Sequence, residues 1–312
     1  AEIRRIDPDH MISVEGSHWA TDLSIFFKRY DDNMLLHFHR YACMPGAEAF
    51  APYLEASRRL GIPLWLGESG ENTGPWFAAM FPLSIALNIG YNLWPWKKMD
   101  CTNSPFSITP PEGWSELIAY THGGNRPSAQ RAEEILEAYL DHVPSEHCRE
   151  NPDLSRAVFR RPGYVVRGTD FDELPGRGIS YSGGRECGNL YYRGNTAMAI
   201  ELLPNSDDVS RFAFDSGWDR LTLCLKETEF ATYYIDGRST GFSATLYFFV
   251  KADAEILITW SDREYPVSVA SSGQEYEHTV QCPKGCGSLK VRVIRGVVLL
   301  NAIAIRAEME TP

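Results

Sequence analysis

A glutamate closes an apolar run and stands between two glycines in IPLWLGESG, residues 62–70. Three other apolar runs also end in side chains that can do chemistry. Together the four runs deliver carboxylates, imidazoles, hydroxyls and indoles: Glu15, Ser17, His18, Trp19, His37, His39, Tyr41, Glu68, Trp94 and Trp96. A carboxylate can attack or shield an oxocarbenium-like centre, a second carboxyl can protonate the leaving oxygen, and aromatic rings can hold a sugar. A single glutamate of this kind is more often a cap or an ion-pair partner, so the agreement of four runs carries the interpretation. The set indicates glycoside hydrolysis.

These runs alternate with helical patterns over residues 1–145. Strands are expected in HMISVEG, NMLLHFHRYA, IPLWLGESG and YNLWPWKKMD. Helices are expected in ATDLSIFFKRYD, GAEAFAPYLEASRRLG, WFAAMFPLSIALNIG and RPSAQRAEEILEAYLDHV, with Gly61 and Gly90 closing the second and third. Four strand-then-helix units favour parallel strands in a β/α barrel or a doubly wound sheet, and the absence of a glycine-rich phosphate loop counts against a nucleotide fold. In a barrel the carboxyl ends of the strands share one face, which would gather the set above.

The second half of the chain has a different pattern. Residues 146–163 read as a linker, and residues 164–312 hold short strand-like runs between turn-rich loops, with almost no helical spacing. This pattern predicts a separate all-β domain, a β-sandwich of the jelly-roll kind. The predicted fold class is therefore α/β followed by all-β.

The composition narrows the classes of ligand that the chain could bind. Among 312 residues, 30 Lys and Arg stand against 41 Asp and Glu, a net charge of −11, which argues against nucleic acid and anionic membranes as partners. It suits a neutral ligand such as a sugar, as do 15 Tyr, 15 Phe and 8 Trp, although most of these aromatics are expected in the core. Only Cys282 and Cys286 of the seven cysteines lie close together, so they form one local disulfide or stay free, and no metal site is predicted. No run long enough to span a membrane and no signal peptide is evident.

The four strand runs resemble, in order, the fifth to eighth strands of a glycoside hydrolase family 5 barrel, on IRRIDPDHMISVEG, HFHRY, WLGESG and LWPWKKMD. The resemblance covers residues 1 to about 145. It implies that Glu68 is the nucleophile, with Ser69 in place of the family's aromatic, and that His39 and Tyr41 form the family's His-x-Tyr. It implies that Trp94 floors the subsite for the cleaved sugar. Trp19, His37 and Trp96 complete the strand-end set and are predicted to bind substrate.

The resemblance also shows what this chain lacks. The family's acid/base is a glutamate after an asparagine at the end of the fourth strand, and no Asn-Glu pair occurs here. Glu15 is the nearest substitute acid within the chain. The first four strands have no counterpart, so a half barrel is expected, completed by upstream sequence, another polypeptide or a second copy. The opening AEIRRIDPDHMISVEG reads as a helix end running into a strand, so we expect sequence upstream.

The second half resembles a carbohydrate-binding module of the family 6 and 35 kind, over about residues 164–306, on TDFDELPGRGISYS, YYRGNTAMAIELL, SGWDRLTLCL and VVLLNAIAI. The resemblance implies a sugar cleft at Trp218, Tyr276 and Asn301, although Trp218 could equally be a core residue. That group's structural calcium uses a glutamate where this chain has Thr169, so Asp170 and Asp172 remain as possible oxygen ligands. No cofactor is required.

The residues and the two resemblances together predict a retaining endo-β-glycanase of cellulase type, acting on plant cell-wall β-glycans and carrying a sugar-binding module. The rival interpretation is a non-catalytic carbohydrate-binding protein with a degenerate half barrel. The predicted partners are a β-glycan polysaccharide or oligosaccharide and a second copy or chain that completes the barrel. Family resemblance implies a secreted protein.

Overall fold

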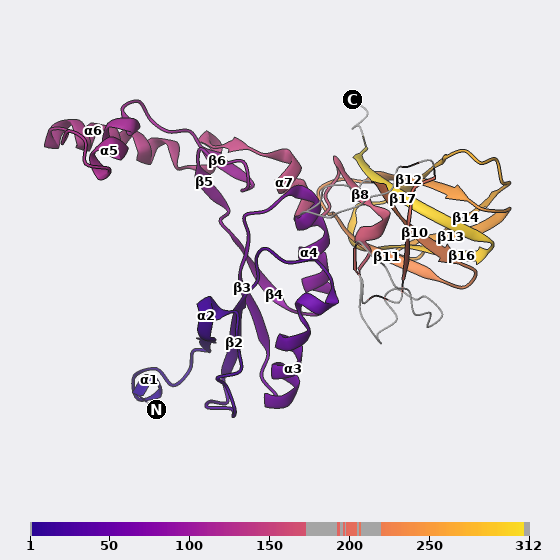
Figure 1. The fold of residues 1–312 in the computed structure, drawn as a ribbon, viewed down its shortest axis with the longest axis horizontal. Helices are drawn as coiled ribbons and strands as arrows, with labels where there is room; N and C mark the ends of the chain where they lie inside the picture. Colours follow the sequence, from indigo (N-terminus) through magenta and orange to yellow (C-terminus); the bar gives the residue numbers. More distant parts are fainter. Residues whose placement is uncertain are drawn as a thin grey trace.

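The computed structural model describes residues 2–172, 192–193, 196, 198–204, 206 and 220–308. Figure 1 shows two bodies side by side, a parallel sheet with helices on one face and a β-sandwich, with a helical arm reaching away from both. Each body has its own apolar core.

A four-stranded parallel sheet organises the first body. Its strands are β1 (Ile12–Glu15), β2 (Met34–His39), β3 (Leu64–Gly70) and β4 (Gly90–Trp94), in that order. Side chains alternate across the sheet, so Leu36, Phe38 and Leu66 are fully buried against the helices. The opposite face carries polar and aromatic groups, namely Ser13, Glu15, His37, Trp65 and Asn92, which are half-buried or exposed.

Two helices cover the buried face, α3 (Ala51–Leu60) and α4 (Gly74–Ala86) (Figure 1). Gly61 ends α3 in the left-handed conformation with φ +65°, which confirms the predicted cap. Helix α4 is apolar all round because it lies between the sheet and the second body, and ten of its thirteen residues are buried. The prediction that Gly90 closes this helix is wrong, since Gly90 begins β4 and the helix ends at Ala86.

The helix predicted in ATDLSIFFKRYD is also wrong. Residues 21–33 form turns and irregular backbone, and only the short α2 (Ser17–Ala20) precedes them. The apolar spacing suggested one buried helix face, but these side chains do not share an environment: Leu23 is buried in the core, whereas Phe27 is 72% exposed. Asp22 also competes for the backbone, accepting the Ser24 N–H at 2.8 Å.

The remaining elements of the first half are α1 (Glu2–Ile6), η1 (Ala47–Ala49), β5 (Lys97–Met99), β6 (Phe106–Ile108), α5 (Trp114–Thr121), α6 (Ala129–His142), η2 (Ser145–His147), β7 (Arg149–Glu150) and α7 (Pro152–Ala157). Helices α5 and α6 form the projecting arm in Figure 1. The predicted final helix is α6, and Ser128 caps it by accepting the Arg131 N–H. The stretch predicted as a linker contains α7, whose Leu154 and Ala157 are buried in the first core.

The second body is a β-sandwich of two antiparallel sheets. One sheet has the order β15-β12-β17-β10-β9 with β8 beside β17, and the other has the order β11-β16-β13-β14. The strands are β8 (Tyr164–Arg167), β9 (Ala199–Leu202), β10 (Leu221–Lys226), β11 (Phe230–Gly237), β12 (Phe242–Val250), β13 (Ala254–Trp260), β14 (Arg263–Val269), β15 (Tyr276–Cys282), β16 (Gly285–Arg295) and β17 (Val297–Ala307), with the 3₁₀ turn η3 (Gly168–Asp170) after β8. Both sheets contribute to one core, as Leu246 and Ile303 of the first meet Tyr233 and Val291 of the second. The predicted all-β half is confirmed as a sandwich.

A buried arginine joins the two bodies. Arg160 has no exposed surface and donates to the Ala78 carbonyl of α4 at 2.8 Å, to Asp172 Oδ1 at 2.8 Å and to the Asp170 carbonyl at 2.6 Å. A buried charge needs a counter-charge and full hydrogen bonding, and Arg160 obtains both from residues on either side of the junction. The bodies are therefore fixed to one another by a polar contact as well as by packing.

Two further features bear on the sequence predictions. The six cysteines within the described part of the chain are free, so Cys282 and Cys286 do not form the local disulfide that was one alternative. Within the same part of the chain, no helix is long and apolar enough to cross a membrane.

Candidate active site

The Glu68 carboxylate lies near the carboxyl end of β3, at the edge of the parallel sheet where the strands end. Strand β2 pairs with β3 so that His39 stands opposite Glu68. The Tyr41 hydroxyl donates to Glu68 Oε2 at 3.0 Å, and His39 Nδ1 lies 3.4 Å from the same oxygen. The Glu68 side chain is 33% exposed, so it remains open to a ligand. The structure thus brings together Glu68, His39 and Tyr41, three of the strand-end residues that the sequence predicted to act together.

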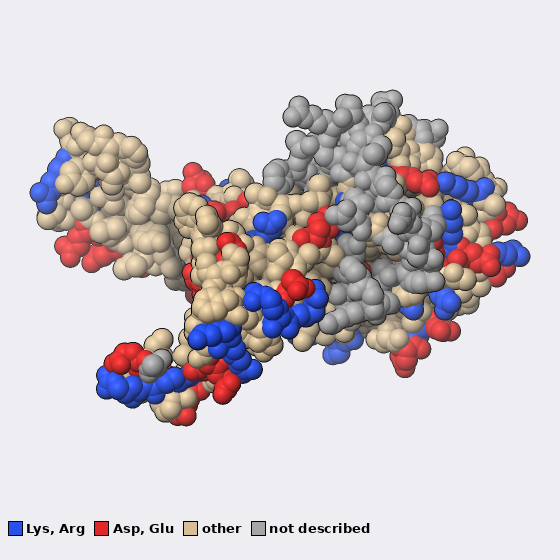
Figure 2. Space-filling model, turned by 60° about the horizontal axis from the view of Figure 1, so that its bottom comes forward, with Lys and Arg blue, Asp and Glu red and all other residues tan. Residues whose placement is uncertain are grey.

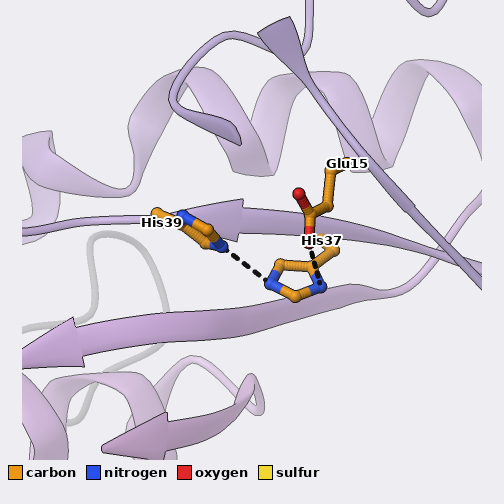
Figure 3. Close-up of side chains that lie close together, drawn as sticks. All are labelled: Glu15, His37 and His39. Carbon is orange, nitrogen blue, oxygen red and sulfur yellow. Dashed lines mark hydrogen bonds and ion pairs between the residues drawn. The ribbon is translucent and has the colours of Figure 1, made fainter. Parts of the chain in front are cut away.

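A chain of contacts continues from His39 across the open face of the sheet. The Nε2 atoms of His39 and His37 lie 3.0 Å apart, and His37 Nδ1 lies 3.6 Å from Glu15 Oε1 (Figure 3). Ser13 Oγ is a second partner of His37 Nδ1, at 3.2 Å. Two imidazoles therefore link the Glu15 and Glu68 carboxylates, and Glu15 contacts His37 rather than Glu68.

The glycines around Glu68 make room for its neighbours. A Cβ at Gly67 would lie 1.6 Å from His37 Nε2, so any other residue would displace that imidazole. Gly70 has φ +150°, and a Cβ there would lie 2.2 Å from the Trp94 carbonyl oxygen. The glycines of the GESG stretch therefore let β2 and β4 approach the carboxylate closely.

Burial changes the acid–base behaviour of two of these groups. Burial raises the pKa of the Tyr41 phenol, and its hydrogen bond to Glu68 raises it further, so the phenol stays protonated and donates. Burial also lowers the pKa of His37, although the nearby Glu15 charge acts in the opposite direction.

Aromatic side chains rim the same region. Trp94 and Trp96 line a hollow of about 510 Å³ together with His37 and Glu68. They are 51% and 42% exposed, so part of each ring can meet a ligand, although Trp96 also packs against Phe106 with ring centroids 5.7 Å apart. Exposed indole faces of this kind cover the apolar faces of sugar rings.

Trp19 sits in a strained turn at the end of β1. His18, Trp19 and Ala20 have φ of +52°, +53° and +59°, a left-handed conformation that is unfavourable for residues other than glycine. Trp19 is 88% exposed. Strained backbone of this kind concentrates at functional sites, which is consistent with the predicted ligand contact.

The sandwich places two of its three predicted cleft residues together. Strand β17 bulges at Asn301, since Tyr247 pairs with Ala302 and Phe248 with Leu300. Asn301 Nδ2 donates to Glu275 Oε1 at 2.7 Å, which puts the amide beside the start of β15 and Tyr276. Tyr276 also packs on Phe248, with ring centroids 5.7 Å apart, and its hydroxyl donates to the Ala270 carbonyl. Trp218 lies outside the described residues.

The suggested calcium ligands already have partners. Asp170 accepts from Arg167 at 2.9 Å and from the Tyr192 hydroxyl at 2.8 Å, and Asp172 accepts from Arg160. Thr169, the substitute for the family's glutamate, is buried. Calcium binding therefore stays a prediction, and it would require these arginines to move.

Apart from the possible calcium ligands Asp170 and Asp172, the sequence predicted no metal ligands, and it did not reveal one cluster of potential ligands in the first body. Donor atoms of Glu15, His37 and His39 all lie within 4.8 Å of one another. A His-x-His pair on a strand puts both imidazoles on one face, which was a usable signal. The glutamate comes from the neighbouring strand, so only the strand register reveals the convergence.

The surface is consistent with a ligand that is not a polyanion. On the face drawn in Figure 2, basic and acidic residues form small mixed groups and no broad basic patch. This agrees with the net charge of −11.

Comparison with known proteins gives only weak likenesses. No protein-family model and no curated protein sequence matches this chain. Among solved structures, CsCBM6-3 from Clostridium stercorarium in complex with cellobiose has 14% identity and a TM-score of 0.33, covering 48% of this chain and 98% of its own. The carbohydrate-binding module CBM6cm-2 from Cellvibrio mixtus lichenase 5A, in complex with cellotriose, has 9% identity and a TM-score of 0.31, over 46% and 97%. The Podospora anserina GH26-CBM35 β-(1,4)-mannanase has 10% identity and a TM-score of 0.30, over 47% and 28%. Likenesses at this level assign neither a family nor an activity to the chain.

Proposed function

We propose that this chain is part of a retaining endo-β-glycanase acting on plant cell-wall β-glycans, with Glu68 as nucleophile. The observation that carries the proposal is the setting of the Glu68 carboxylate, which is partly exposed, meets the Tyr41 hydroxyl at 3.0 Å and lies beside the exposed indoles of Trp94 and Trp96. In this proposal β1 to β4 are the fifth to eighth strands of a β/α barrel. Residues 1–145 form the catalytic part, residues 146–163 join it to the sandwich, and residues 164–312 bind glycan outside the cell.

In a double-displacement mechanism these residues would have different roles. Glu68 attacks the anomeric carbon as the glycosidic C–O bond breaks, and an acid gives its proton to the leaving oxygen. Water then cleaves the glycosyl-enzyme bond and returns the Glu68 carboxylate. Tyr41 and His39 orient the Glu68 carboxylate, while Trp94 and Trp96 hold the sugar.

The proton donor is the open role. A retaining enzyme needs a second carboxyl about 5–5.5 Å from the nucleophile. Glu15 is the substitute within the chain, although its carboxylate contacts His37, at 3.6 Å. A glutamate from the strands that would complete the barrel is the other source.

Glu68→Gln tests the proposal, because the amide keeps the shape of the side chain and loses its nucleophilic charge. The chain is incubated with a panel of β-glucan, xyloglucan, mannan and xylan, and released reducing sugar is measured alongside calorimetric binding. We expect Glu68→Gln to abolish hydrolysis of the glycan that the parent cleaves and to retain its binding. Glu133→Gln, on the exposed surface of α6, is the matched control and should hydrolyse like the parent. Hydrolysis by Glu68→Gln within tenfold of the parent would overturn the assignment.

A glycan-binding protein without hydrolysis is the second candidate, favoured by the Asn301, Glu275 and Tyr276 grouping on the sandwich. The same panel separates the two. Binding without reducing-sugar release by the parent supports this candidate, and Asn301→Ala should then weaken the binding.

A further inference from the structure

We propose that Glu15, His37 and His39 bind one divalent transition-metal ion of the zinc class on the open face of the parallel sheet. Figure 3 shows the three side chains converging from β1 and β2. Their donor atoms lie within 4.8 Å of one another. This site shares His39 with the surroundings of Glu68 and Glu15 with the candidate proton donors, but zinc binding is measured without hydrolysis and does not depend on it.

The two imidazoles leave a place for a cation between them. A neutral imidazole has one N–H and one lone pair. His39 Nδ1 faces the Glu68 carboxylate at 3.4 Å, and His37 Nδ1 faces Ser13 Oγ and Glu15. If each Nδ1 carries the proton and donates, both Nε2 lone pairs point at each other across 3.0 Å. In that tautomeric state the two lone pairs repel, and a cation bound by both nitrogens relieves the repulsion.

The separation of the nitrogens fits zinc after a small adjustment. Zinc binds imidazole nitrogen at about 2.0–2.1 Å, so a tetrahedral site needs its nitrogens about 3.4 Å apart. The observed 3.0 Å is a few tenths of an ångström shorter, which a small rotation of either ring supplies. Two imidazoles and one carboxylate are a donor set that suits zinc and leaves one position for water.

Glu15 supplies the third donor, and other groups then hold the rings. Its side chain is 56% exposed, so it has room to turn from His37 Nδ1 toward the ion. Ser13 Oγ remains as the acceptor for His37 Nδ1, and Glu68 remains as the acceptor for His39 Nδ1. Such outer partners fix the tautomer and orientation of metal-binding histidines.

Burial and close packing hold the two rings of the site in place. The His37 and His39 side chains are only 17% and 11% exposed, and Gly67 is needed for the His37 ring to lie where it does. In the part of the chain that the structure describes, no Lys or Arg forms an ion pair with Glu15 or Glu68. Among the described residues, neither carboxylate is therefore neutralised by a lysine or arginine that a metal ion would have to displace.

The test is calorimetric titration of zinc chloride into the full chain after chelator treatment, repeated with single variants. We expect one zinc per parent chain. His37→Gln and His39→Gln should each weaken binding at least tenfold, as should Gly67→Ala, which displaces the His37 ring. His10→Gln is the matched control, because its side chain is 87% exposed and lies outside the cluster, and it should bind like the parent. Circular dichroism and metal-free melting curves establish that each variant is folded.

Two further arms make the result decisive. In the first arm, cobalt replaces zinc as a spectroscopic probe. Ligation by nitrogen and oxygen gives no thiolate-to-cobalt charge-transfer band, so we expect a spectrum without that band, which excludes the free cysteines as ligands. Glu68→Gln should keep zinc affinity within tenfold, since its amide oxygen still accepts from His39, while the proposed hydrolysis is lost. Absence of zinc binding, or zinc binding unchanged in the doubly substituted His37→Gln, His39→Gln chain, would overturn the proposal.

Discussion

The hydrogen bond from Tyr41 holds the side chain of the candidate nucleophile in place. Burial raises the pKa of the Tyr41 phenol, so the phenol stays protonated and donates to Glu68 Oε2 at 3.0 Å. A hydrogen bond to a charged group contributes about 1.5–3 kcal/mol. The carboxylate in turn needs this support because His39 and Tyr41 are the partners that the structure gives it.

Tyr41→Phe removes that donor and keeps the ring. If the proposed hydrolysis holds, the turnover number should fall roughly 10- to 150-fold, the kinetic equivalent of the lost hydrogen bond. Steady-state kinetics on the cleaved glycan measure the effect, and Tyr120→Phe, on the exposed arm helix α5, is the control. A turnover number within twofold of the parent would remove Tyr41 from the mechanism.

The residues of the candidate site could be predicted to different degrees. Glu68, His39 and Tyr41 were predictable together because parallel strands bring their carboxyl ends to one face, and the structure shows the contacts. The contact between Glu15 and His37 was not, because it depends on the register of β1 against β2, which no local pattern encodes. The roles of these residues remain predictions.

At the scale of elements, short-range patterns predicted strands better than helices. Each of the four strands lies where an apolar run ends at a turn or glycine. The helix expected over residues 20–31 did not form, because periodic apolar residues also arise when side chains divide between core and solvent, as Leu23 and Phe27 do. The helix α7 was missed because the sequence there is short and polar, and its apolar residues Leu154 and Ala157 become buried only when the chain folds back onto the core of the first body.

The Arg160 junction gives a stability prediction. Its guanidinium is fully buried and bonds to Asp172 Oδ1 at 2.8 Å, so Arg160→Ala leaves a buried carboxylate without that partner. We expect a loss of about 3–5 kcal/mol in the free energy of unfolding. Asp172→Ala should also destabilise, and the double variant should lose less than the sum, with a coupling of about 0.5–3 kcal/mol.

Denaturant unfolding of the four chains measures this coupling. Arg58→Ala, on the exposed side of α3, should change the free energy of unfolding by no more than about 0.5 kcal/mol and serves as the control. Strict additivity of the Arg160 and Asp172 changes would show that the pair does not act as a unit.

A second junction contact makes stability depend on pH. The hydrogen bond from Arg238 lowers the pKa of Asp236, and Arg161 of the joining segment lies 3.4 Å from the same carboxylate. A group whose pKa is lower in the folded chain adds stability above its unfolded pKa, about 3.9 for aspartate. That contribution is lost as the pH falls below this value toward the folded pKa.

Asp236→Asn should therefore reduce the pH dependence itself. The free energy of unfolding of the parent should drop more between pH 5 and pH 3 than that of the variant, because the other carboxylates contribute equally to both. Denaturant titrations at the two pH values provide the comparison. An equal drop in parent and variant would mean that Asp236 does not contribute to the acid sensitivity.

The whole molecule leaves an open sheet and an apolar arm in contact with solvent. Strands β1 and β4 each have one neighbour in the sheet, so their outer edges are unpaired within the described residues. The arm adds exposed side chains at Ile118, Tyr120, Leu136 and Leu140. Unpaired edges and apolar surfaces favour association with another chain. We therefore expect the chain to associate, with a second copy or another polypeptide placed against β1 or β4.

The free edge of β1 offers a selective test of that expectation. The Ile12 N–H donates to Asn33, so the N–H of the next residue, Ser13, points toward the open edge. Ser13→Pro removes this donor without breaking the pairing of β1 with β2, whereas Ser13→Ala removes only the hydroxyl and is its matched control. Light scattering of the purified chain should give a mass well above its own 35.2 kDa for the parent and for Ser13→Ala, and a mass closer to that of one chain for Ser13→Pro.

A parent that stays at the mass of a single chain over a wide concentration range would contradict self-association. The partner would then be a different polypeptide, which is sought by adding the upstream half of a barrel. If the Ser13→Pro chain associates as strongly as the parent, the contact lies at β4 or on the arm rather than at the β1 edge. Leu136→Glu and Leu140→Glu then distinguish these two surfaces, because they should weaken association only if the arm makes the contact.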